Sequence, residues 1–155
     1  MCRQAVETAT GTPAPDEGAP RQVRHPAAGC EACGPWPVER ASTRGLPWPW
    51  LRRVCEFIQH NLNQQLTLLT LAAVVHMSPY HFARLFKQSA GVPPHRFVLG
   101  RRIALASALL REPQPSIGEV GRLVGFRTPS HFTTAFRRMT GVTPSAYRCG
   151  WRHER

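Results

Sequence analysis

The chain has 155 residues, 15 prolines and a formal net charge of +11. Residues 51–155 carry this whole excess, with fifteen Lys and Arg against four acids, which is typical of a segment that attracts nucleic acid or an acidic membrane surface. No stretch approaches the roughly 18 apolar residues of a membrane span, and no signal-peptide pattern is present, so a spanning or secreted protein is excluded and we expect a cytoplasmic one.

The first fifty residues differ from the rest. They hold eight of the prolines and five of the glycines, and their charges balance. Apolar periodicity is absent, so this stretch cannot bury enough surface to offset the entropy of ordering the chain. We predict a disordered Pro/Gly/Ala-rich segment over 1–48, a folded domain over 49–148 and a basic tail over 149–155.

Beyond this segment the apolar spacing is helical throughout, which predicts an all-α fold. Two helices, the second capped by Thr67, each have one apolar face: Leu51, Val54, Cys55, Ile58 and Leu62, then Leu68, Leu71, Val74 and Val75. Ser78 and Pro79 are a typical helix start, and Gly91 is placed to end this third helix in a left-handed conformation. Its inward side is Phe82, Leu85 and Phe86. Together these helices predict a helix-turn-helix unit over about 51–92.

A linker helix is predicted next, over about 94–111, with an apolar side of Leu99, Ile103, Ala106, Leu109 and Leu110. Ser116 and Glu119 then have capping-box spacing and open a second unit over about 116–148. The apolar residues of its first helix are Ile117, Val120, Leu123 and Val124. Thr128 caps the following helix, whose inner face is Phe132, Phe136 and Met139. Gly141 ends that helix, and Thr143-Pro144 opens a last short turn.

The second unit repeats the first. Residues 78–97 and 128–147 align without a gap, and seven of the twenty pairs are identical: Pro79/Pro129, His81/His131, Phe82/Phe132, Phe86/Phe136, Gly91/Gly141, Val92/Val142 and Pro94/Pro144. The offset is 49 before the turn and 50 after it, so the second turn is one residue longer. Two copies are too few for a solenoid, and the pattern indicates two similar units that perform one task twice.

Over residues 51–148 the chain resembles the DNA-binding domain of AraC/XylS-family transcriptional regulators. The resemblance is carried by both units and the linker: Ser78-Pro79-Tyr80-His81-Phe82, Arg84-Leu85-Phe86-Lys87, Arg101-Arg102-Ile103, Ala106, Leu109-Leu110, Gly125-Phe126, Ser130-His131-Phe132, Ala135-Phe136-Arg137-Arg138, Gly141-Val142-Thr143-Pro144 and Tyr147-Arg148. It implies a bacterial regulator of transcription whose two recognition helices enter successive major grooves on one face of double-stranded DNA.

The first recognition helix has an outward side that follows from its period. With Phe82 and Phe86 inward, about 100° per residue puts Tyr80, Arg84 and Lys87 outward, with Ala83 beside them. The resemblance implies base contacts at Tyr80, Ala83 and Arg84. Arg84 suits a bidentate contact to guanine and Tyr80 a thymine methyl. We expect Lys87 and Ser78 to contact the DNA backbone.

The second recognition helix has a different chemistry, because its candidate base-reading residues are Ser130, Thr133 and Thr134. Many relatives carry Arg at the place of Thr134, and short hydroxyls reach less far and select bases less well. We therefore expect the first unit to supply most base specificity, and the second chiefly to hold the backbone. The residues expected there are Arg127, Thr128, Arg137 and Arg138.

Arg101 and Arg102 on the linker are candidates for phosphates between the grooves, although a solvated helix face is an alternative. Since one chain has two units, we expect a monomer on DNA, with half-sites about 10 base pairs apart. His81 and His131 have no second ligand at helical spacing, so packing or a phosphate hydrogen bond is expected. No metal, no cofactor and no enzymatic activity are expected, because no catalytic constellation is present.

The cysteines leave a rival interpretation open. Cys30 and Cys33, with His25 nearby, form half of a zinc-type pattern, and Cys2 is the other thiol of that segment. A structural zinc site usually needs two such halves, so a Cys-dependent metal or redox sensor is the lesser alternative. Neither Cys55, on a core face, nor Cys149 completes a disulfide framework.

The wider protein is also open from sequence. Most relatives carry a sensory domain that is not encoded here, so the chain is a stand-alone regulator or a truncated or decayed fragment of a longer one. An effector, a promoter and the sign of regulation are not assigned. A contact with RNA polymerase is compatible with the resemblance.

Overall fold

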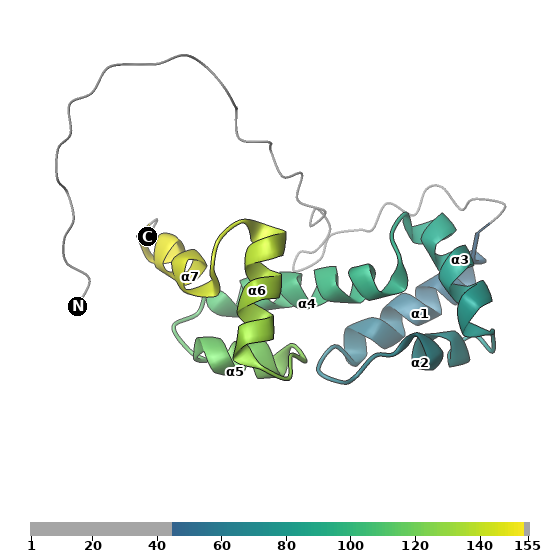
Figure 1. Ribbon diagram of the computed structural model, residues 1–155, viewed down its shortest axis with the longest axis horizontal. Coiled ribbons are helices and arrows are strands. Elements are labelled where there is room, and N and C mark those ends of the chain that lie inside the picture. The colour runs from purple at the N-terminus through teal and green to yellow at the C-terminus, as the bar shows by residue number, and fades with distance from the viewer. Residues whose placement is uncertain (1–44, 154–155) are drawn as a thin grey trace, which may run out of the picture.

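The computed structural model describes residues 45–153, and within them the chain forms seven α-helices and no strand. The helices are α1 (Trp48–His60), α2 (Leu68–Ala73), α3 (Pro79–Ala90), α4 (Pro94–Leu110), α5 (Ile117–Leu123), α6 (Pro129–Thr140) and α7 (Pro144–His153). The long helix α4 joins a first unit of α1–α3 to a second unit of α5–α7 (Figure 1). The predicted all-α fold with two helix-turn-helix units and a linker helix is confirmed. None of the helices in this part of the chain is long and apolar enough to cross a membrane.

Each unit has a core built on aromatic residues of the repeat. In the first unit the Phe86 ring lies 5.4 Å from that of Phe82 and 5.4 Å from that of Phe97, at the start of α4. In the second unit the Phe136 ring lies 5.7 Å from Phe132 and 5.5 Å from Tyr147. Edge-on and tilted pairs at these distances stabilise a core beyond the area that they bury. The two recognition helices are therefore fixed in the same way.

The last helix corrects the prediction of a short turn followed by a basic tail from residue 149. The chain stays helical to His153 because Thr143 accepts the backbone N–H of Ala146 at 3.2 Å, Tyr147 packs on Phe136, and Arg148 donates to the Pro115 carbonyl oxygen at 2.6 Å. Since Phe97 and Tyr147 are fifty positions apart, α7 is the counterpart of the first turns of α4.

The helix ends follow the predicted signals with one exception. Thr67, Ser116 and Thr128 each accept a backbone N–H of the first turn, and Glu119 completes the capping box with Ser116. The helix-ending glycines are left-handed, with φ of 73° at Gly91 and 84° at Gly141. Ser78 stands at the N-cap of α3 but its side chain makes no capping hydrogen bond there.

The domain begins slightly earlier than the predicted boundary at residue 49. The side chain of Leu46 is buried in the first core, and its backbone N–H donates to Ser89 Oγ at 2.7 Å. Helix α1 then starts at Trp48, after Pro47. An apolar side chain placed before the first helix thus extends the fold. Residues 1–44, with Cys2, His25, Cys30 and Cys33, lie outside the described residues, so the predicted disorder is untested.

Two predicted core positions are wrong. Leu68 is 40% exposed and Leu123 is 53% exposed. In the short helices α2 and α5 the small residues Ala72 and Gly121 are buried instead. A Cβ on Gly121 would lie 3.1 Å from the Phe132 ring, so α5 and α6 approach each other closely at this glycine. Phe97, Val98 and Phe126 are buried too, although their spacing did not predict it.

The capping difference predicts a difference in stability. Ser116→Ala removes the hydroxyl that accepts the Glu119 N–H at 3.3 Å, and we expect it to lower the free energy of unfolding by about 1 kcal/mol. The matched control is Ser78→Ala, because Ser78 occupies the same kind of position without a capping bond; its change should stay within about 0.5 kcal/mol. Urea denaturation followed by circular dichroism measures both, and equal losses would contradict the assignment.

Candidate nucleic-acid interface

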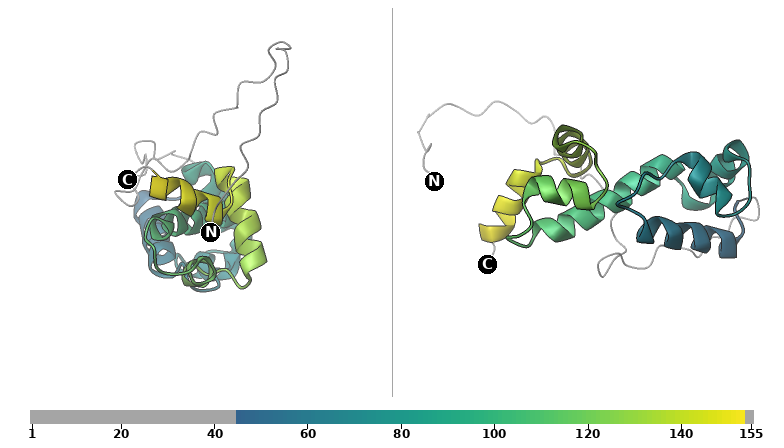
Figure 2. Two further views of the ribbon diagram at one scale, coloured as in Figure 1. Left: turned by 90° about the vertical axis from the view of Figure 1, so that its left-hand side faces the viewer. Right: turned by 90° about the horizontal axis from the view of Figure 1, so that it is seen from below.

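Helices α3 and α6 lie on the same side of α4. Both run across the direction of the linker helix on the viewer's side of Figure 1, and the view from below shows them on one side of the molecule (Figure 2). Their positions follow from the repeat, because each packs its phenylalanine pair against its own unit. The consequence is that the outward faces of the two helices belong to one surface of the protein.

On α3 the outward face has the predicted composition. Phe82 and Phe86 are fully buried, whereas Tyr80 is 83% exposed. Arg84 and Lys87 are exposed too, and Ala83 is partly buried between them. The side chains of Tyr80, Arg84 and Lys87 make no hydrogen bond or ion pair with another described residue. An aromatic ring and two cations are therefore presented on one face without neutralising partners among residues 45–153.

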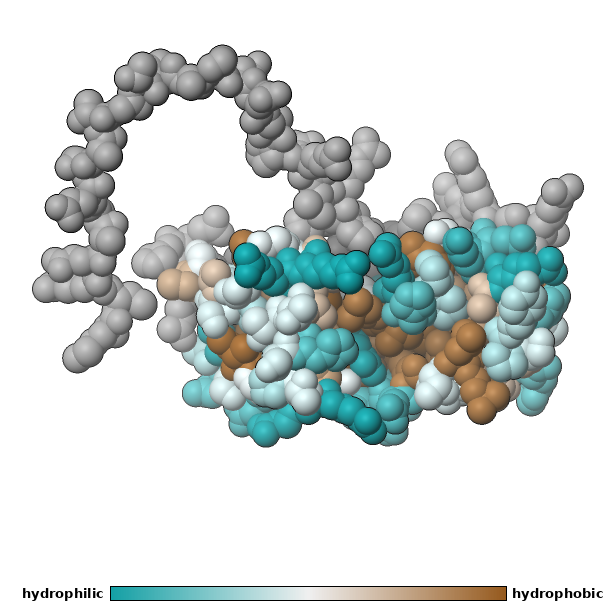
Figure 3. Space-filling model, viewed as in Figure 1, coloured by the Kyte–Doolittle hydropathy of each residue, from teal (hydrophilic) through white to brown (hydrophobic). Residues whose placement is uncertain are grey.

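On α6 the outward face carries hydroxyls and arginines. Ser130, Thr134, Arg137 and Arg138 are exposed, and Thr133 is partly buried. Hydrophilic side chains accordingly cover much of the face seen in Figure 3, and hydrophobic ones are visible between the two units. Short hydroxyls stand where α3 has Tyr80 and Arg84, so the two faces are equivalent in place but not in chemistry.

The N-terminal turns of the two helices also differ. Thr128 Oγ1 accepts the His131 backbone N–H at 3.3 Å, so its oxygen already serves as the cap of α6. Ser78 is exposed and its hydroxyl makes no such bond. Arg127, the extra residue of the second turn, is exposed and lies 3.5 Å from Gln65 Oε1. Ser78 and Thr128 are both predicted to contact the DNA backbone, and of the two only the Ser78 hydroxyl is not already used as a helix cap.

The linker arginines are engaged by the protein itself. Arg101 Nη2 donates to Gln59 Oε1 at 2.8 Å, and its guanidinium lies 5.9 Å from the centre of the Phe97 ring. Arg102 is half-buried and donates to the Leu62 and Gln64 carbonyl oxygens. Burial lowers the pKa of the Arg102 guanidinium below its ordinary value, although arginine remains charged. The hydrogen bonds of both arginines thus go to the first unit, which leaves their donors less available for the expected phosphate contacts.

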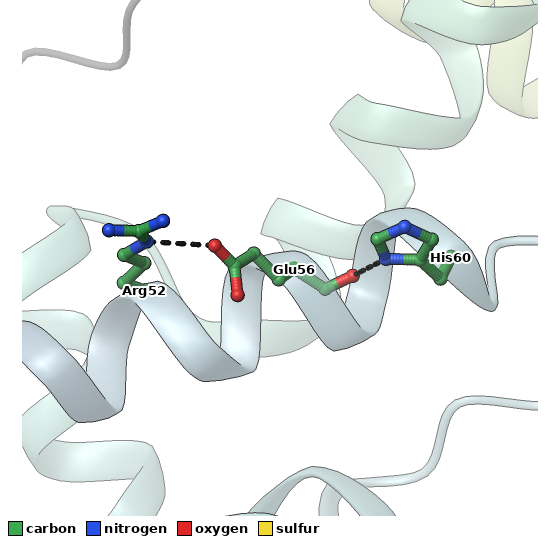
Figure 4. Close-up of polar contacts among 3 residues, drawn as sticks. All are labelled: Arg52, Glu56 and His60. Carbon is green, nitrogen blue, oxygen red and sulfur yellow. Dashed lines mark hydrogen bonds and ion pairs between the residues drawn. The ribbon is translucent and has the colours of Figure 1, made fainter.

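On the outer face of α1 a cation is neutralised by a neighbouring acid, unlike the cations on the outward face of α3. Arg52 Nε donates to Glu56 Oε1 at 2.8 Å, and His60 Nδ1 lies 2.7 Å from the Glu56 carbonyl oxygen (Figure 4). Contact with a carbonyl requires the proton of His60 on Nδ1. The Glu56 bond and charge raise the pKa of Arg52. Such exposed pairs contribute little stability, but they leave less free charge on this face.

The histidines and cysteines of this part of the chain form no metal site. No group of three or more His, Cys, Asp or Glu side chains is placed to hold an ion within residues 45–153. His131 instead packs its ring 5.3 Å from that of Phe126, which agrees with the expected packing role. Burial raises the pKa of the Cys55 thiol to about 11, so the unreactive thiol predominates at neutral pH.

One feature of the site region was not found from sequence. Gly125 and Phe126, in the turn between α5 and α6, meet Arg102 and the loop after α1. The signal in the sequence was Arg127, the extra residue of the second turn, which marks the departure from the repeat but does not name the residues it meets.

Comparison with known proteins gives a consistent result. The model of a family described as a helix-turn-helix domain matches residues 71–149. The bifunctional transcriptional activator/DNA repair enzyme AdaA of Bacillus subtilis is 33% identical over 99 residues, which are 64% of this chain and 47% of that protein. The chain spans less than half the length of the curated relatives that it matches.

Solved structures share the same architecture. The DNA-binding domain of AdpA, a global transcriptional factor solved in complex with a target DNA, is similar with a TM-score of 0.65 and 34% identity, covering 68% of this chain and 95% of that one. A transcriptional regulator of Chromobacterium violaceum, described among AraC-type DNA-binding domain-containing proteins, has a TM-score of 0.62 and 29% identity, covering 66% of this chain and 92% of that one.

Proposed function

The chain belongs to the AraC-type helix-turn-helix family, and we propose that it is a sequence-specific DNA-binding regulator of transcription that inserts α3 and α6 into successive major grooves. The observation that carries this proposal is the common surface of the two helices, each anchored by a phenylalanine pair and exposed on the opposite face. A major groove admits one α-helix, so two parallel sites on one face of the protein fit two grooves on one face of a duplex.

In the first unit, Tyr80, Ala83 and Arg84 read bases. The exposure of Tyr80 supports this, because a ring that is 83% exposed packs little against the described residues and is free to contact a base. A bidentate contact from Arg84 to guanine is worth about 1–3 kcal/mol of discrimination. Lys87 and the free hydroxyl of Ser78 contact the backbone and fix the register of the helix.

In the second unit, Ser130, Thr133 and Thr134 face the bases, while Arg127, Thr128, Arg137 and Arg138 hold the backbone. For Thr128 the backbone N–H groups at the start of α6 are the better donors, since its hydroxyl oxygen already caps the helix. Phosphate contacts position a protein without reading sequence. The second unit therefore adds affinity and register, and the first supplies most of the specificity.

We leave Arg101 and Arg102 out of the contacts with the DNA backbone because both are hydrogen-bonded to the first unit.

One chain binds as a monomer, with half-sites about 10 base pairs apart, since it presents two recognition helices by itself. It acts in the cytoplasm on bacterial DNA as a regulator without enzymatic activity, and regulation by contact with RNA polymerase is compatible with this arrangement.

Enrichment from a random-sequence pool of double-stranded DNA tests the proposal. The full chain is incubated with the pool at two salt concentrations, and bound DNA is sequenced after each round. We expect a bipartite motif with parts about one helical turn apart, and binding that weakens with salt because counterions are released. Salt-sensitive binding without an enriched motif would leave only phosphate attraction and reject sequence-specific regulation.

The asymmetry between the units gives a second prediction. Arg84 and Thr134 are equivalent in the repeat, so Arg84→Thr should relax the base preference of the first half-site at a cost of about 1–3 kcal/mol in specific binding. Thr134→Arg should sharpen preference in the second half-site. Affinities for duplexes with single base-pair changes measure both effects. If base changes in the second half-site cost the wild-type protein more than those in the first, the assignment of roles is wrong.

A further inference from the structure

We propose that Arg102 is a positioning residue that joins the two helix-turn-helix units into one rigid body and thereby fixes which spacing between half-sites the protein accepts. The inference rests on the proposed function and adds the device that sets the geometry of the DNA site. Arg102 itself makes no contact with DNA in this proposal; it acts through the placement of α3 and α6.

The side chain of Arg102 touches both units. It stands in the middle of α4, and Nε donates to the Leu62 carbonyl oxygen at 3.0 Å while Nη2 donates to that of Gln64 at 2.6 Å. Both carbonyls belong to the loop between α1 and α2 in the first unit. Its guanidinium also lies 5.8 Å from the centre of the Phe126 ring, in the core of the second unit. A planar, forked cation can make these contacts at once, whereas lysine cannot.

Gly125 gives independent evidence that the units are tightly joined here. It is left-handed, with φ of 86°, and the equivalent residue of the first unit, His76, is also left-handed, with φ of 52°. Because a histidine fills that place in the first unit, the backbone conformation alone does not demand glycine. A Cβ on Gly125 would lie 2.3 Å from the Leu62 carbonyl oxygen and 2.8 Å from Arg102 Nη2. The glycine is therefore required by the approach of the first unit.

The extra residue of the second turn lies at the same joint. Arg127 has no counterpart in the first turn, and its Nη2 lies 3.5 Å from Gln65 Oε1 in the α1–α2 loop. The departure from the repeat thus occurs where the second unit meets the first. Two identical units connected only by a helix would need neither an added residue nor a glycine at this turn.

A rigid joint has a consequence for DNA. Adding one base pair between the half-sites shifts the second groove by about 3.4 Å and turns it by roughly 34°. A protein whose units are locked together loses one half-site at the wrong spacing, whereas loosely connected units adjust. The joint therefore restricts binding to DNA sites whose half-sites have one particular spacing.

Binding of the full chain to duplexes that carry the enriched site with its own spacing, or with one base pair more or fewer, tests this. We expect the preference of the wild type for its own spacing to fall on the order of tenfold in Arg102→Met. Base preferences within each half-site and the slope of log affinity against log salt should stay unchanged. Equal loss at every spacing, with a slope smaller by about 0.9, would identify a phosphate contact and overturn the proposal.

Two matched controls separate the joint from charge and from backbone strain. Arg96→Met removes one exposed cation from the same helix and should leave the spacing preference unchanged. Gly125→Ala should weaken the preference as Arg102→Met does, while Gly141→Ala should not, because Gly141 is equally left-handed but has nothing within 4 Å of an added Cβ. If Arg102→Met does not fold, the comparison of the two glycine variants decides.

A measurement without DNA keeps this test distinct from that of the proposed function. Spin labels on non-natural residues at the exposed positions Gln88 in α3 and Arg122 in α5 report the distance distribution between the units. We expect a narrow distribution in the wild type and a broader one in Arg102→Met. An unchanged distribution would overturn the proposed joint even if the wild type binds its site, and broadening would support the joint even if no DNA motif is enriched.

Discussion

Burial of one face of each recognition helix is the constraint on which the rest of the structure depends. Phe82 and Phe86 in α3, and Phe132 and Phe136 in α6, are fully buried, and fixing them sets the rotation of each helix about its axis. At about 100° per residue, the exposed positions follow without further choice. The same apolar burial that stabilises the fold therefore presents the residues that we assign to DNA.

A second constraint relates the two helices to each other. A single helix, α4, connects units whose cores are separate, so their relative orientation depends on side-chain contacts at the point where they meet. Arg102 supplies hydrogen bonds to backbone carbonyls there, and Gly125 allows the close approach. Hydrogen bonds from a charged donor to a backbone carbonyl are stronger than those between two neutral groups. Such bonds suit a joint that must keep two recognition surfaces in register.

Local signals in the sequence were sufficient to predict the helices of each unit. The contacts between residues far apart in the chain could not be predicted from such signals. Thr67, Ser116, Gly91 and Gly141 act within a few residues of their own positions, so caps and helix ends were predictable. The role of Arg102 was not, because its partners are backbone carbonyls about forty positions away, and any residue can supply a carbonyl. The repeat pairs Tyr147 with Phe97, in the first turns of α4, but the signal at Thr143-Pro144 marks only the start of a helix, so the length of α7 was not predicted.

The most direct test of the account is a hydroxyl-radical footprint of the full chain on its enriched site, combined with the stoichiometry of the complex. One chain should protect two patches of the sugar-phosphate backbone about 10 base pairs apart on one face of the duplex. A single protected patch, or two patches that appear only when two chains are bound, would contradict the claim that one chain reads successive major grooves with α3 and α6.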